Sequence, residues 1–203
     1  IPKKILVSQG AKESKILQYD GLKEDIYIAD YEPNPNFLNS LPFEDFVTLR
    51  PEALKNIYIS KSEKSIVPIL LKLLNRKRIN VLYLPRYDTD KAWSQGYDNV
   101  FTPKEPINGL DACYYSKAVL TGAGTFAREA ACMGTPAVSF FPGKKLLAVD
   151  MTLISKSNMV HSRDPMFIID YLIKSKRQNV GTSRAKSVKN EVLELVNSCV
   201  IND

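Results

Sequence analysis

Short apolar runs alternate along the chain with segments in which apolar positions recur at helical spacing. The runs typical of buried β-strands are residues 46–49, 81–84, 99–101, 118–120, 137–140 and 159–160. Helical spacing predicts helices at residues 62–74, 109–115, 125–133, 145–154 and 165–173, and a long amphipathic helix at 183–200. Alternating strands and helices favour right-handed β-α-β crossovers. We therefore expect an α/β fold with a Rossmann-like parallel sheet and helices on both faces.

The first 45 residues lack this regular pattern. They contain Tyr-Asp-Gly-Leu-Lys-Glu at 19–24 and Pro-Asn-Pro at 33–35, where turn-forming residues discourage regular structure. We expect residues 1–45 to be a loop-rich entry and hinge segment, with Gly21 permitting the bend. Residues 46–180 then form the Rossmann-like domain, and residues 181–203 form a C-terminal helix. The chain opens at Ile1 without a methionine, as a fragment or a processed product would.

Composition describes an ordinary globular protein: 203 residues, 44% hydrophobic and 25% charged. Apolar runs are far shorter than the ~20 residues that cross a bilayer, and no signal peptide is visible, so we expect a cytoplasmic protein without a membrane span. The three cysteines are widely spaced, which favours reduced thiols over disulfides. One histidine leaves little room for zinc or a histidine-based triad, and no metal is predicted.

The net charge of +6 fits either nucleic acid or an anionic small ligand. Cations concentrate between Lys174 and Lys189 without an intervening acid, as on a solvated helix face and loop. Aromatic residues do not interleave with these charges, so nucleic acid is disfavoured as a partner.

The segment from Thr121 to Thr125 joins a predicted strand to a predicted helix and carries Gly122-Ala123-Gly124. Glycines here can take positive φ and leave backbone amides uncovered, and the helix dipole adds positive charge at the same place. A pyrophosphate is the ligand that such a turn favours. The pattern matches neither a Walker loop nor the full Gly-x-Gly-x-x-Gly, so a purely structural tight turn stays open.

Glu129 lies one helical turn beyond Thr125, on a helix of small residues. Its carboxylate could accept hydrogen bonds from a ribose diol while the phosphates rest on the helix start. The alternative is a surface glutamate paired with Arg128 or Lys117.

The pattern Gly-x-Gly-Thr-x-x-x-Glu-Ala-x-x-x-Gly-x-Pro resembles the nucleotide-sugar motif in the C-terminal domain of GT-B-fold enzymes, particularly non-hydrolysing UDP-N-acetylglucosamine 2-epimerases. Further blocks are Leu-Arg-Pro-Glu at 49–52, Leu-Pro-Arg at 84–86, Asn-Gly-Leu at 108–110 and Phe-Pro-Gly-Lys at 141–144. Together with residues 19–24 and 122–130 they resemble a largely archaeal family of epimerase-like or glycosyltransferase-like proteins. Members of that family carry an N-terminal Rossmann-like domain before this region.

The resemblance implies that this chain is the C-terminal, nucleotide-binding half of a two-domain GT-B-type protein. The final helix of GT-B proteins typically crosses back toward the other domain. Apolar positions such as Val188, Val192 and Leu195 would then need cover from that missing domain.

Some positions depart from the epimerase pattern. Leu49 stands where the epimerases have a functional histidine, Arg86 where they tend to place a second one, and Ala123 where a serine commonly precedes the glycines. The epimerase chemistry therefore does not carry over, and no catalytic residue is assigned. Glu24 and Glu52 are acid/base candidates without further support. The single histidine, His161, fits a capping or packing role.

Arg50 and Arg86 each end a predicted strand beside a proline and could clamp a second phosphate or a carboxylate, although a surface ion pair is the alternative for each. Lys144 follows the Pro-Gly turn and is a further phosphate neighbour.

The leading hypothesis is a UDP-sugar-binding domain of a glycosyltransferase-like or epimerase-like protein that needs no other cofactor. Its predicted nucleotide-binding residues are Gly122, Ala123, Gly124, Thr125, Glu129, Arg50, Arg86 and Lys144. A non-catalytic nucleotide-binding or regulatory module is the alternative. A basic surface that binds nucleic acid is the third, weaker hypothesis, and a homo-oligomer is left open.

Overall fold

A computed structural model describes residues 3–57, 59–156 and 159–201 of the protein. Within these ranges six parallel strands form one sheet in the order β3-β2-β1-β4-β5-β6. The strands are β1 (Val47–Arg50), β2 (Val81–Tyr83), β3 (Val100–Phe101), β4 (Val119–Thr121), β5 (Ala137–Ser139) and β6 (Met159–His161). The parallel Rossmann-like sheet is confirmed. The strand order reverses between β1 and β4, and in such sheets ligands bind beyond the carboxyl ends of the strands at that reversal.

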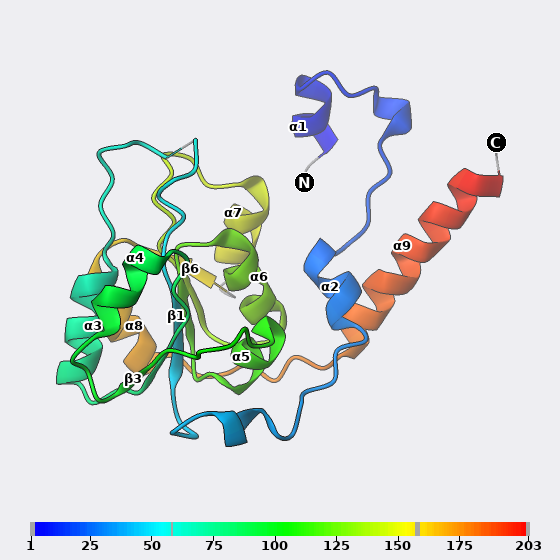
Figure 1. Ribbon diagram of the computed structural model, residues 1–203. Coiled ribbons are helices and arrows are strands. Elements are labelled where there is room, and N and C mark those ends of the chain that lie inside the picture. Colours follow the sequence, from blue (N-terminus) through cyan, green and yellow to red (C-terminus); the bar gives the residue numbers. More distant parts are fainter. Residues whose placement is uncertain (1–2, 58, 157–158, 202–203) are drawn as a thin grey trace.

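Helices cover both faces of the sheet (Figure 1). On one face lie α3 (Val67–Arg76) and α8 (Pro165–Lys174), and on the other lie α5 (Gly109–Tyr115) and α6 (Gly124–Cys132). α7 (Ala148–Ser155) packs against α6 and β6, while α4 (Asp88–Lys91) and the 3-10 turn η3 (Ala92–Ser94) precede β3. α3 begins five residues later than predicted, at Val67, because Pro68 suits only a first helical turn.

Alternation along the strands divides the core into two layers. Val47 and Leu49 of β1 pack with α3 and α8, whereas Thr48 points to the opposite side, where it bonds Ser116. The second layer contains α5, α6 and the small side chains Ala127, Ala130 and Ala131. Small residues let α6 lie close to the sheet, which brings its first turn to the carboxyl ends of β1 and β4.

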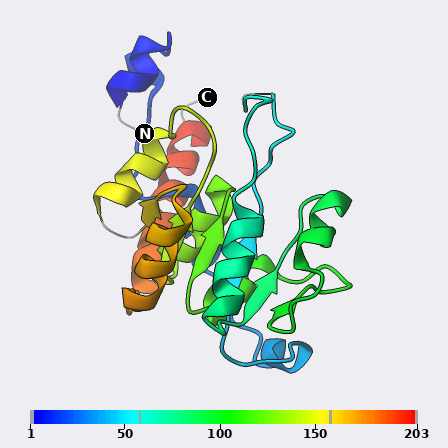
Figure 2. The ribbon, with the colours of Figure 1, turned by 90° about the vertical axis from the view of Figure 1, so that its left-hand side faces the viewer.

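The first 45 residues hold more helix than the sequence indicated: α1 (Lys3–Ser8), η1 (Glu13–Lys15), α2 (Lys23–Ile28) and η2 (Phe37–Ser40). α2 packs against both α6 and α9 (Ser183–Ile201). α1 buries no side chain and projects away from the rest of the molecule (Figures 1 and 2). The short, charged α2 gave no helical pattern because its Glu24 and Asp25 are buried in ion pairs.

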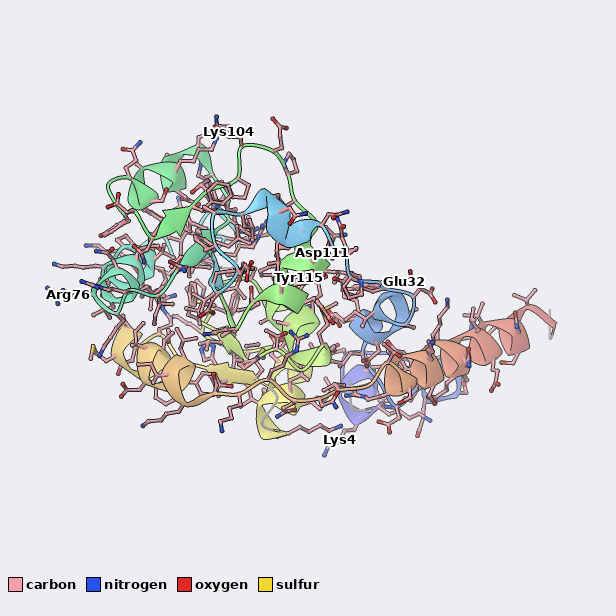
Figure 3. All side chains as sticks on the ribbon, turned by 90° about the horizontal axis from the view of Figure 1, so that it is seen from below. Lys4, Glu32, Arg76, Lys104, Asp111 and Tyr115 are labelled. Atoms are coloured by element: carbon pink, nitrogen blue, oxygen red, sulfur yellow. The ribbon has the colours of Figure 1, made fainter. Side chains whose placement is uncertain are left out.

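α9 docks on α2 at one end and extends into solvent at the other (Figures 1 and 3). Val188 is buried beside Gly21, where a Cβ would lie 2.4 Å from Cγ1 of Val188. The close approach of α9 to the chain at position 21 therefore explains the glycine there. Farther along, Leu193, Val196 and Val200 are exposed. None of the helices in the described ranges combines the length and apolar character that a bilayer span requires.

Candidate functional site

A cleft of about 390 Å³ opens at the carboxyl edge of the sheet, where the strand order reverses. Seven of the eight predicted site residues line it: Arg50, Arg86, Gly122, Ala123, Gly124, Thr125 and Glu129. Arg50 ends β1 and lies in register with Thr121, the last residue of β4. The other lining residues are Ala53, Asn56, Phe126 and Phe141. Segments distant in the sequence therefore meet at the position that the topology favours for a ligand.

The two glycines serve a different purpose from the one that the sequence suggested. Neither Gly122 nor Gly124 is among the described residues with positive φ. A Cβ at Gly122 would lie 2.5 Å from Cα of Glu52, and a Cβ at Gly124 would lie 2.8 Å from Nη1 of Arg128. The expectation of positive φ is therefore wrong, and both glycines make room for neighbouring residues.

The amides of the turn fall into two groups. Gly122 N–H donates to the carbonyl of Arg50 at 3.1 Å, and Ala123 N–H donates to Thr121 Oγ1 at 2.9 Å. These two amides are unavailable to a ligand. In the part of the chain that the structure describes, nothing accepts a hydrogen bond from the amides of Gly124, Thr125 and Phe126. These are the first amides of α6, a helix of nine residues, and they lie at the positive end of its dipole.

Arg50 and Arg86 bring positive charge to the same cleft without a carboxylate partner. Neither forms an ion pair with any described residue, so the surface ion-pair alternative does not hold within these ranges. Arg50 lies 6.0 Å from the ring centroid of Phe126, and Nε of Arg86 is buried without a hydrogen-bond partner among the described atoms. Burial, and then the charge of Arg86, lowers the pKa of Arg50, although the Glu129 carboxylate in the same cleft partly opposes this. Two neighbouring cations that disfavour one another in this way favour an anion between them.

Glu129 is half-buried at the rim of the cleft, and its Oε1 accepts a hydrogen bond of 2.8 Å from the Tyr27 hydroxyl. Its alternative partners are engaged elsewhere, since Arg128 bonds Glu24 and Asp150 and Lys117 bonds Asp45. Burial raises the pKa of Glu129, although the Tyr27 hydrogen bond lowers it. The second carboxylate oxygen, Oε2, accepts no hydrogen bond from the described residues and is available to a donor such as a hydroxyl.

Arg128 stands at the centre of a buried ion-pair network that the sequence did not reveal. Its Nε donates to Glu24 Oε1 at 2.8 Å and its Nη1 to Asp150 Oδ1 at 2.9 Å, while Nη2 donates to Thr125 Oγ1 at 3.1 Å. The side chains of Arg128, Glu24 and Asp150 are only 8%, 1% and 6% exposed. Burial lowers the pKa of Arg128, but the bonds to both carboxylates more than offset this, so the net shift is upward.

This network joins α2, α6 and α7 directly beneath the free amides of the cleft. Arg128 occupies the space that a side chain at Gly124 would need. In the sequence, the only sign of this ion-pair network is the glycine at position 124, four residues before Arg128.

The acid/base candidates are held in structural contacts. Glu52 is buried, pairs with Arg163 at 3.2 Å, and accepts hydrogen bonds from Ser65 Oγ and the amide of Ile66. Glu24 pairs with Arg128. His161 ends β6 outside the cleft lining, its Nδ1 is buried without a partner among the described atoms, and burial lowers its pKa. Among the described residues that line the cleft, Glu129 is the only carboxylate.

Lys144 lies apart from the other predicted residues, in an adjoining cleft of about 530 Å³. The two clefts share Gly124, Thr125 and Phe141, so Lys144 is a neighbour of the helix start across Phe141. No cluster of metal-ligating side chains occurs within the described ranges. Cys113 and Cys132 are buried free thiols, as the sequence indicated.

The parallel sheet, its helices on both faces and the cleft at the strand reversal define an α/β protein of the GT-B-like Rossmann type. Within that class the chain belongs to the family described as "Protein of unknown function (DUF354)", which it matches over residues 1–202. Uncharacterized protein MJ0665 of Methanocaldococcus jannaschii is 35% identical over 127 residues, which cover 62% of this chain.

Two solved structures share the fold. UDP-GlcNAc 2-epimerase of M. jannaschii, in complex with UDP-GlcNAc and UDP, superimposes with a TM-score of 0.66 over 96% of this chain at 16% identity. UDP-GlcNAc 2-epimerase of Neisseria meningitidis, bound to UDP-GlcNAc, gives a TM-score of 0.56 over 94% of this chain at 12% identity. The chain covers 36% of the length of MJ0665, and 58% and 57% of the two epimerases.

Proposed function

We propose that this chain binds a nucleotide sugar, with UDP as the nucleotide, in the cleft between β1 and the start of α6. The observation that carries the proposal is the convergence of two unpaired arginines and a free helix N-terminus on one cavity. This arrangement suits an anion with several oxygens, and a diphosphate fits it better than a single carboxylate. The fold shared with epimerase structures that hold UDP-GlcNAc supports the choice of nucleotide.

Each lining group has a role in this proposal. The amides of Gly124, Thr125 and Phe126 donate to one phosphate, and Arg50 and Arg86 neutralise the other. Glu129, held by Tyr27, accepts hydrogen bonds from the ribose hydroxyls through its free oxygen. Lys144 in the adjoining cleft adds positive charge on the side toward the sugar. Gly122 and Ala123 shape the turn and do not donate.

The chain is also proposed to act together with a further domain that supplies the sugar and acceptor contacts. Its coverage of 58% of the superimposed epimerase is consistent with such an arrangement. Helices α2 and α9 pack against one another, and we propose this contact as the junction toward that domain.

A non-catalytic nucleotide-binding module is the second candidate, and one observation favours it. The buried carboxylates near the site, Glu24 and Glu52, are already ion-paired, which leaves Glu129 as the one carboxylate among the described cleft residues. General acid/base catalysis needs a group within reach of the transferred proton, and Glu129 is assigned to the ribose. On this reading the chain binds without turnover by itself.

Isothermal titration calorimetry with UDP, UDP-GlcNAc, inorganic pyrophosphate and uridine tests the proposal. UDP and UDP-GlcNAc should bind, and uridine should bind far more weakly because it lacks the diphosphate. Arg50→Gln and Arg86→Gln should each weaken UDP binding about 10- to 150-fold, the range for a hydrogen bond to a charged group. Arg76→Gln, which removes an exposed arginine at the opposite edge of the sheet, is the matched control. UDP binding that is unchanged in both cleft variants would overturn the proposal.

A further inference from the structure

A second groove, of about 660 Å³, lies at the amino edge of the sheet, opposite the nucleotide cleft. It is bounded by residues that enter β1, β2 and β4 and by the segment after α8. Its apolar surface comes from Ile79, which is half-buried, and from Ile173, which is exposed, whereas Phe46 and Val47 are 1% exposed beneath it. Neither the family match nor the superimposed structures assign a role to this edge.

Cations surround this groove. α3 and α8 pack against one another and both end here, so the basic residues that follow each helix gather on one surface. We call this surface the basic edge; its members are Arg76, Lys77, Arg78, Lys117, Lys174, Lys176 and Arg177. All seven are exposed. Figure 3 views the molecule from this side, and Arg76 projects outward there at the end of α3.

The acidic residues of this edge do not neutralise it. Asp45 pairs with Lys117, and Glu44 is the neighbouring acid in the segment that enters β1. The side chains of Arg76, Lys77, Arg78, Lys174 and Lys176 form no ion pair with any residue in the described part of the chain. Cations at helix C-termini complement the helix dipoles, but that effect reaches only the last turn. Lys176 and Arg78 lie beyond it.

Arg78 adds an independent observation. It is the one described residue other than glycine with positive φ, at 54°. It occupies the C′ position of a Schellman motif, in which Ile79 N–H bonds the Leu74 carbonyl at 3.0 Å and Arg78 N–H bonds the Asn75 carbonyl at 2.9 Å. Glycine is strongly favoured at this position because a Cβ is strained there. Arg78 therefore presents its cationic side chain to the groove from a left-handed backbone position.

The apolar component of the basic edge indicates the kind of anion. Ile173 lines the groove and is 57% exposed. The nearby aromatic rings already have partners: Tyr115 stacks on Phe37 at 5.5 Å, and the ring of Tyr114, although 37% exposed, lies 4.7 Å from the guanidinium of Arg177. Nucleic-acid strands are bound with exposed rings on which bases stack. An exposed aliphatic side chain among cations instead suits a bilayer whose headgroups are anionic.

We propose that the basic edge docks the protein on the surface of a membrane that contains anionic phospholipids. The headgroup phosphates bind the unpaired cations, and Ile173 reaches the boundary of the acyl chains. Because the nucleotide cleft lies at the opposite edge of the sheet, it faces away from the bilayer. Docking and nucleotide binding are then independent of one another.

Co-sedimentation of the full chain with phospholipid vesicles tests this proposal. Vesicles that contain phosphatidylglycerol should bind the protein, pure phosphatidylcholine vesicles should not, and added salt should weaken binding. The triple variant Lys77→Gln, Arg78→Gly, Lys176→Gln should lose about 100-fold in vesicle affinity, at roughly fivefold for each removed charge. Arg78→Gly relieves the positive φ, so impaired folding is not expected to account for the loss. Ile173→Ala should lose about tenfold.

A control variant removes the same net charge elsewhere: Lys12→Gln, Lys15→Gln, Lys104→Gln, all exposed. It should bind vesicles as the unmodified chain does. The proposal is overturned if anionic vesicles do not bind, or if the two triple variants lose affinity equally. It is also overturned if the protein binds a single-stranded oligonucleotide more tightly than the vesicles and Ile173→Ala changes neither of these two affinities. Failure of UDP binding leaves this proposal intact.

Discussion

Replacement of Arg128 by methionine tests the buried network beneath the cleft. The change removes one guanidinium that serves two carboxylates, Glu24 and Asp150, whose side chains are 1% and 6% exposed. Loss of one partner of a buried ion pair costs about 3–5 kcal/mol, because it leaves a buried charge without compensation. For a chain of this size each kcal/mol lowers the melting temperature by about 2–4 °C, so Arg128→Met should melt roughly 6–20 °C lower.

Urea denaturation provides the measurement, as the free energy of unfolding of each variant. A triple variant, Glu24→Gln, Arg128→Met, Asp150→Asn, should recover most of the stability because no buried charge remains.

Two results would refute this reasoning. A loss below about 1 kcal/mol in Arg128→Met would show that the three charges are not buried together as the structure has them. A triple variant that is as unstable as Arg128→Met would show that the lost stability does not come from carboxylates left without a partner.

Two further predictions concern the turn and its neighbour. Gly122→Ala should destabilise the protein by about 1–3 kcal/mol because its Cβ would lie 2.5 Å from Cα of Glu52. Gly109→Ala, whose Cβ would meet Phe126 at an ordinary 3.5 Å, should be neutral or slightly stabilising in the same urea titration, and equal losses would contradict the account. Burial raises the pKa of the Glu129 carboxyl, so the folded protein binds the proton of this carboxyl more tightly than the unfolded chain does. Above the raised pKa, the ionised Glu129 carboxylate lowers the stability of the fold. Glu129→Gln should therefore raise the urea midpoint of unfolding at alkaline pH and lose this advantage in acid. In calorimetry the same variant should bind UDP about tenfold more weakly or worse. A lowered urea midpoint at alkaline pH would contradict the prediction.

The sheet was predictable because its information is local. Each strand carries a short, largely apolar run, each helix has its own apolar spacing, and the parallel connectivity follows from their alternation. The ends of the strands were predictable for the same reason. The sequence therefore predicts that Arg50, Arg86 and the Gly122–Thr125 turn lie at one edge of the sheet, and the structure places them in one cleft there.

The contacts beneath the site were beyond prediction because they join residues far apart in the chain. Glu24 and Arg128 are 104 residues apart, and neither carries a sign of burial in its local sequence. The sequence marks the glycines at 122 and 124 as unusual, but the structural reason for them is the close approach of Glu52 and Arg128. Local sequence identifies a position that cannot hold a side chain, and only the folded structure identifies its neighbour.

An amide-resolved NMR titration with UDP tests the binding site most directly. We expect the largest ¹H–¹⁵N chemical-shift changes at the free amides of Gly124, Thr125 and Phe126. The amide shifts of Gly122 and Ala123 should change little, because these amides are already hydrogen-bonded. Saturating shifts at the basic edge instead, or no shift in the first turn of α6 at millimolar UDP, would contradict it.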